Sequence, residues 1–153
     1  MFISRILAAA ALAVLPLSSQ AVAVGPDVAV QRAVDAVLAK HGGEQISPNQ
    51  VRWADGGAVT TIQDPSKWGD PSTCAYGNFC VYTGSGYVGN RTDFYNCRAY
   101  TYYDDFWSYV NNQTGHTVAV LYSDQGSDPF YTPGAWHGQF TWNGLNYSAI
   151  KPC

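Results

Sequence analysis

The sequence has little charge of either sign. Asp, Glu, Lys and Arg make up 12% of its 153 residues, and the eight Lys and Arg residues are scattered along the chain. Proteins that bind nucleic acids neutralise phosphates with clustered basic side chains, so we expect no nucleic-acid partner. Aromatic residues are abundant at 14%, and their large apolar rings bury enough surface to offset the entropy of ordering the chain. The composition therefore predicts a folded protein rather than a disordered one.

The common sequence signatures of an active site are also missing. The chain contains no His-Glu-x-x-His and no Gly-x-Ser-x-Gly, which excludes the commonest zinc-peptidase and hydrolase motifs. Gly84, Gly86 and Gly89 satisfy a Gly-x-Gly-x-x-Gly pattern, but strand-like residues follow them where a dinucleotide-binding motif needs a helix. We therefore predict that the protein is not an enzyme and requires no cofactor.

No run of residues approaches the ~20 consecutive apolar positions of a membrane-spanning helix. The longest apolar run, residues 6–17, follows Arg5 and precedes small residues that end at Ala23. This pattern predicts a secretory signal peptide over residues 1–23, cleaved after Ala23 or, as a second choice, after Ala21. An uncleaved anchor is the alternative. We expect a secreted, extracellular protein with no membrane contact after cleavage.

Four cysteines are an even set in a small exported chain, which favours two disulfides. We predict one bond that closes a short loop containing Gly77 and a second bond that tethers the C-terminus to the middle of the chain, although three connectivities are possible. A zinc site is the competing interpretation, but the chain lacks a Cys-x2-Cys pair and its histidines follow no ligand spacing. The predicted pairs are Cys74 with Cys80 and Cys97 with Cys153.

The region between the signal peptide and the first cysteine predicts a helix and a hairpin. Apolar residues recur at helical spacing over residues 27–41, with Asp27 as the N-cap and Gly42 and Gly43 as the C-terminal stop. Residues 50–62 place strand-like runs on both sides of an Asp-Gly-Gly turn, a pattern typical of a hairpin. We assign residues 24–62 to this segment. The polar residues 63–73 predict a linker.

From Cys74 onward, short aromatic and β-branched runs alternate with turn residues about every ten positions. Strands at this spacing, with no helical pattern between them, predict an antiparallel sandwich or Greek key. We therefore assign residues 74–153 to one disulfide-bonded all-β domain. The expected strands lie in NFCVYT, RTDFYNC, FWSYVN, TVAVLYS and GQFTWN.

Residues 80–94, CVYTGSGYVGNRTDF, contain Tyr82 and Tyr87 five apart, with Gly89 two residues later. This spacing lets a glycine-permitted hairpin fold back under the second tyrosine, and it resembles the signature of the βγ-crystallin Greek-key motif. The following DDFWSY resembles the calcium motif of that family in all but the last place. The resemblance implies calcium as a possible ligand of Asp104, Asp105 and Ser108. The alternative is a solvated turn.

The order of the leader, helix, VRWADGG hairpin, paired cysteines and CVY resembles secreted actinobacterial proteins grouped with the Streptomyces-type metalloprotease inhibitors. That resemblance covers residues 74–124 best. It implies an all-β, βγ-crystallin-like Greek-key sandwich with one clear motif and a degenerate second one, preceded by the short helix and hairpin. It also implies a monomeric inhibitor whose partner is an extracellular protease, and a metalloprotease above all.

A rigid exposed loop that presents an apolar side chain could act as the inhibitory element, because a preorganised loop has little ordering cost on binding. Residues 125–138 are the candidate, with Phe130 and Tyr131 between two prolines. The alternative is that these rings complete the core. The alternative function is a calcium-binding or cell-wall polysaccharide-binding module without inhibitory activity, in which sugar rings stack on exposed tryptophans.

Overall fold

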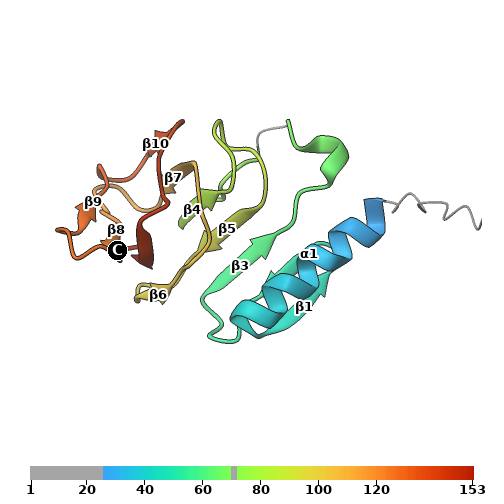
Figure 1. Cartoon of the computed structure of the whole chain (residues 1–153). Helices are drawn as coiled ribbons and strands as arrows, with labels where there is room; N and C mark the ends of the chain where they lie inside the picture. Colours follow the sequence, from blue (N-terminus) through green and yellow to red (C-terminus); the bar gives the residue numbers. More distant parts are fainter. Residues whose placement is uncertain (1–25, 70–71) are drawn as a thin grey trace, which may run out of the picture.

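The computed structural model of the chain describes residues 26–69 and 72–153. The predicted signal peptide lies outside these residues. The described residues form one α-helix, a short 3-10 turn and eleven strands in two antiparallel sheets (Figure 1), which confirms the predicted all-β class. Within this part of the chain, no helix has the length and apolar character to cross a membrane.

The larger sheet, sheet A, has seven strands in the order β1-β2-β3-β5-β4-β7-β10. Each neighbouring pair is antiparallel. The strands are β1 (Glu44–Ser47), β2 (Gln50–Arg52), β3 (Ala58–Thr61), β4 (Asn78–Tyr82), β5 (Arg91–Phe94), β7 (Ser108–Asn112) and β10 (His137–Gln139).

The smaller sheet, sheet B, has four antiparallel strands in the order β6-β11-β8-β9. Two of these strands are only two residues long. Those two strands and the C-terminal strand were not expected from the sequence. The strands are β6 (Tyr100–Thr101), β8 (Val120–Ser123), β9 (Phe130–Tyr131) and β11 (Tyr147–Lys151).

The last eight strands form two sets of four with the same arrangement. In the first set, β4, β5 and β7 lie in sheet A, and β6 lies in sheet B. In the second set, β8, β9 and β11 lie in sheet B, and β10 lies in sheet A. Each set therefore gives one strand to the sheet of the other, with β6 beside β11 and β10 beside β7. Through this exchange, the two sets of four strands are hydrogen-bonded to each other in both sheets.

Helix α1 (Pro26–His41) begins one residue before the expected N-cap, so Asp27 lies in its first turn. Proline suits the first helical position because it has no N–H to leave unpaired. The helix ends where the sequence predicts. Gly42 donates its N–H to the Leu38 carbonyl at 2.8 Å and adopts a φ of 65°, which glycine accepts without steric cost.

One continuous core joins the N-terminal segment to the rest of the chain. Val34 of α1, Val51 of β2 and Ala58 of β3 are completely buried in the same cluster as the apolar residues of both sheets. Strand β3 also pairs along its whole length with β5. Strands on both sides of residues 63–73, β3 before them and β5 after them, therefore belong to one sheet. The 3-10 turn η1 (Pro65–Lys67) lies within residues 63–73.

Candidate functional site

The hairpin between β4 and β5 has the folded form that the tyrosine and glycine spacing predicts. The rings of Tyr82 and Tyr87 lie 5.7 Å apart, and Gly89 has a φ of 81°. The buried Ser108 hydroxyl holds the hairpin from strand β7. It donates to the Gly84 carbonyl at 2.6 Å and accepts from the Tyr87 N–H at 3.0 Å. Ser108 therefore positions this hairpin.

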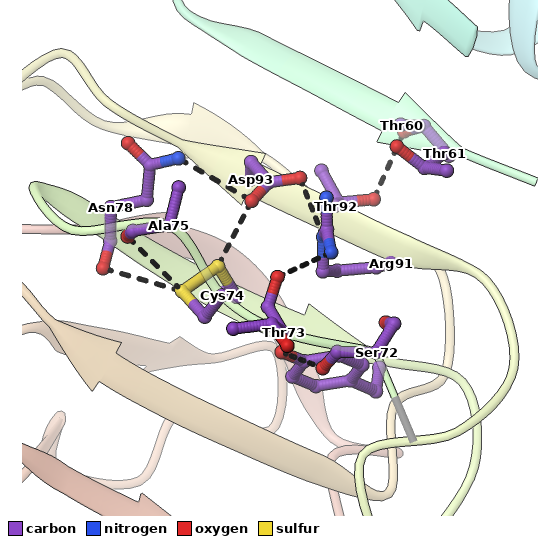
Figure 2. A network of polar contacts seen from close by, with 12 residues as sticks. Thr60, Thr61, Ser72, Thr73, Cys74, Ala75, Asn78, Arg91, Thr92 and Asp93 are labelled. Carbon is purple, nitrogen blue, oxygen red and sulfur yellow. Dashed lines mark hydrogen bonds and ion pairs between the residues drawn. A yellow bond between two sulfur atoms is a disulfide. The ribbon is translucent and has the colours of Figure 1, made fainter. Parts of the chain in front are cut away.

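The two disulfides are Cys74–Cys80 and Cys97–Cys153, which is the predicted pairing. The first bond closes the loop that leads into β4 and lies against Asp93, whose Oδ1 is 3.1 Å from Cys80 Sγ (Figure 2). Among the described residues, Cys74, Cys80 and Asp93 are the one group of potential metal ligands close enough to share an ion. Because the two sulfurs are bonded to each other, they are not thiolates that could hold zinc.

Arg91 completes this buried polar group. Its Nε donates to Asp93 Oδ2 at 2.8 Å, and its Nη1 donates to the Thr73 carbonyl at 2.5 Å (Figure 2). Asp93 is only 5% exposed, so the charge of its carboxylate requires a partner of this kind. The ion pair thus fixes the segment before Cys74 onto the outer face of sheet A.

Asp104 lies close to the C-terminal end of α1. It forms an ion pair with Lys40, and its Oδ2 lies 3.2 Å from His41 Nε2. Burial alone raises the pKa of the Asp104 carboxyl, but the hydrogen bonds from His41 and Lys40 outweigh burial and hold that pKa below its ordinary value. The Lys40 ammonium group also suits the negative end of the helix dipole.

The three candidate calcium ligands therefore have different surroundings. Asp104 is engaged by Lys40, and the Ser108 hydroxyl is engaged by the hairpin. Asp105 lines a cleft beside α1. A calcium ion at these residues would have to compete with the ammonium group of Lys40 for the Asp104 carboxylate.

Phe130 and Tyr131 lie in strand β9, at the edge of sheet B, rather than in the predicted loop. Their backbone pairs with Leu121 and Val120 of β8. Phe130 packs against the core, with its ring 4.5 Å from that of Trp142, whereas Tyr131 is 64% exposed. The two rings thus point to different environments, because successive residues of a strand face opposite sides.

Two large exposed aromatic side chains flank strand β10. We call Trp136, β10 and Phe140 the β10 surface. Trp136 is 70% exposed and Phe140 is 63% exposed. Strand β10 is the last strand of sheet A, so its other edge has no neighbouring strand within the described part of the chain. The surface therefore combines an open strand edge with two large apolar rings.

Glycines set the positions of both rings. The Phe140 ring lies against Gly86, where a Cβ would come within 2.9 Å of it, and the Gly86 N–H donates to the Phe140 carbonyl at 2.8 Å. The Trp136 ring lies in the same way over Gly115. Tyr87 supports Phe140 in an edge-to-face contact with ring centroids 5.6 Å apart. The β10 surface is therefore braced by the hairpin that Ser108 holds.

The β10 surface is nearly free of charge. Residues 129–150 contain no Asp, Glu, Lys or Arg, and His137 is the one titratable imidazole among them. Natural edge strands are commonly protected from further pairing by lysine, proline or a bulge. Strand β10 contains neither lysine nor proline. This long uncharged stretch is the sequence signal that could have identified the β10 surface. The sequence pattern instead predicted a loop over residues 125–138 and a strand over residues 138–143.

In comparisons with protein-family profiles, curated proteins and solved structures, none matched this chain.

Proposed function

We propose that the protein is a secreted peptidase inhibitor of βγ-crystallin-like fold that blocks an extracellular metalloprotease with its β10 surface. The observation that carries this proposal is an open, uncharged strand edge between two exposed aromatic rings. The repeated four-strand arrangement and the tyrosine-glycine hairpin support the βγ-crystallin-like assignment.

Peptidase clefts bind chain segments in an extended form, and an edge strand already has that form. Extended segments gain affinity from main-chain hydrogen bonds and specificity from side chains that enter pockets. Strand β10 is held by its pairing with β7, so little conformational freedom is lost when it binds. The Cys97–Cys153 disulfide adds a covalent restraint at the C-terminus, which follows β10 and β11 along the chain.

The aromatic rings give the proposal its specificity. Exposed aromatic residues near the centre of an interface carry a large share of binding energy. A thermolysin-like pocket accepts a large apolar side chain, which Phe140 or Trp136 supplies. The absence of Lys and Arg from residues 129–150 makes the surface unsuited to a pocket that selects basic side chains. A metalloprotease of the thermolysin type is therefore the expected target class.

The test is residual activity of metallo, serine and cysteine proteases after incubation with the purified protein, together with its intact mass. We expect inhibition of the metalloprotease. Phe140→Ala or Trp136→Ala should weaken it by more than ~2 kcal/mol, about thirtyfold. Tyr103→Ala is the matched control, because Tyr103 is 67% exposed but lies beside α1. Full activity of every protease would refute the proposal.

A further inference from the structure

A cleft of about 290 Å³ opens between α1 and the inner face of sheet A. Its two walls differ in chemistry. The helix contributes the small apolar side chains Ala33, Ala36 and Val37, whereas the opposite wall carries three hydroxyl groups. Those hydroxyls belong to Thr60, Thr92 and Tyr102.

The hydroxyl wall holds one hydrogen more than its own contacts use. Trp53 Nε1 donates to Thr60 Oγ1 at 2.9 Å, Thr60 Oγ1 lies 2.9 Å from Thr92 Oγ1, and Thr92 is hydrogen-bonded to the Tyr102 hydroxyl. One indole N–H and three hydroxyls supply four hydrogens for these three links. Whichever way the hydroxyls turn, one hydroxyl hydrogen needs another acceptor, and all three residues line the cleft.

Burial keeps the Tyr102 hydroxyl in its protonated form. The residue is 1% exposed, and desolvation raises the pKa of its phenol well above the ordinary value. The wall therefore offers a hydrogen-bond donor at every ordinary pH. An acceptor atom on a ligand would satisfy that donor, since an unpaired polar hydrogen in a buried wall costs free energy.

The rim of the cleft disfavours an anion. Lys40 is the one cationic side chain in the lining and is already paired with Asp104, while the Asp105 carboxylate adds a second negative charge. Asn90 and Thr83 complete the rim with neutral polar groups. The carboxylates accept hydrogen bonds from ligand hydroxyls. A neutral ligand with several hydroxyl groups therefore matches the rim better than a phosphate or a carboxylate does.

We propose that this cleft binds one sugar unit of an uncharged polysaccharide. A sugar ring has an apolar C–H face for the alanine wall and hydroxyl groups for the polar wall and rim. The volume lies just below the ~300–1,000 Å³ range of small-molecule pockets, which suits a single ring. The proposal is independent of protease inhibition, because the cleft and the β10 surface share no residue.

The test is an NMR titration of the disulfide-bonded protein with tetramers of N-acetylglucosamine, glucose (β-1,4-linked) and xylose. We expect saturable shifts in the amides of residues 33–37, Thr92 and residues 102–105. Ala36→Leu should fill the cleft and weaken binding about tenfold or more. Ala39→Leu is the matched control, because Ala39 is an exposed residue of the same helix outside the cleft lining.

Three results would overturn the proposal: no saturable shift with any tetramer at millimolar concentration, shifts that map elsewhere, or unchanged binding by the Ala36→Leu variant. Shifts at Asp104 and Asp105 with calcium chloride alone would assign the rim to a cation instead. Tyr102→Phe provides a second variant, because it removes a hydroxyl from the cleft and keeps the ring in the core. It should weaken sugar binding and leave protease inhibition unchanged.

Discussion

The Ser108→Ala substitution is the sharpest test of how the β4–β5 hairpin is held. The Ser108 side chain is completely buried and makes two hydrogen bonds to hairpin backbone, one to the Gly84 carbonyl and one from the Tyr87 N–H. Alanine removes both bonds and puts no competing group in their place. Tyr87 also has a φ of 65°, a conformation that a tyrosine adopts only when its surroundings hold it there.

The expected loss follows from these two bonds. Each intramolecular hydrogen bond contributes about 1 kcal/mol net, so the substitution should lower the free energy of unfolding by about 2 kcal/mol. In a domain of this size, that loss corresponds to a fall in Tm of roughly 8 °C. Because Gly86 and Tyr87 brace Phe140, we also expect weaker protease inhibition by the folded variant.

The measurement is urea unfolding of the oxidised protein, with thermal melting as a second readout. Ser85→Ala is the control, because Ser85 is an exposed serine in the same hairpin. The wild-type and Ser85→Ala proteins should unfold at the same urea concentration, and Ser108→Ala well below it. Equal stability of the two variants would show that Ser108 does not hold the hairpin.

Two further outcomes are expected. Phe130→Ala should lower the free energy of unfolding by about 2 kcal/mol because its ring packs on the core, whereas Tyr131→Ala should change it by less than about 0.5 kcal/mol; equal losses in urea unfolding would contradict this assignment. The lowered pKa of Asp104 stabilises the folded state above the ordinary carboxyl pKa. The free energy of unfolding of the wild type should therefore exceed that of Asp104→Asn by up to about 1 kcal/mol at pH 7. This difference should disappear as the pH falls below about 4. A difference that is independent of pH would refute the role of the Lys40 ion pair.

Local pattern was sufficient for much of the fold. The Asp-Gly-Gly turn and the β-branched runs around it predicted the β2–β3 hairpin, and the glycine-containing segment after Tyr82 predicted the turn between β4 and β5. The even cysteine count and the short Cys74–Cys80 loop predicted the disulfide pairing. These features depend on residues close in sequence, whose backbone preferences survive in most tertiary contexts.

The sequence was less informative about short strands and side-chain partners. Strands β6 and β9 are two residues long, so neither shows an alternating pattern that could be recognised. The Phe130-Tyr131 pair illustrates the consequence. Its position between two prolines predicted an exposed loop, with packing of both rings in the core as the alternative. Because the segment pairs with β8, Phe130 packs against the core and Tyr131 is exposed.

The sequence by itself determined the β class and the hairpin that carries Tyr82 and Tyr87, and it favoured the disulfide pairs that the structure contains. Only the tertiary structure decided which sheet each strand joins, including the exchange of β6 and β10. It also decided that Asp104 meets Lys40 across 64 positions of the chain and that Phe140 rests on Gly86. Such contacts join residues far apart in sequence, so they form only when the packing of both sheets and α1 brings them together, and no local pattern encodes them.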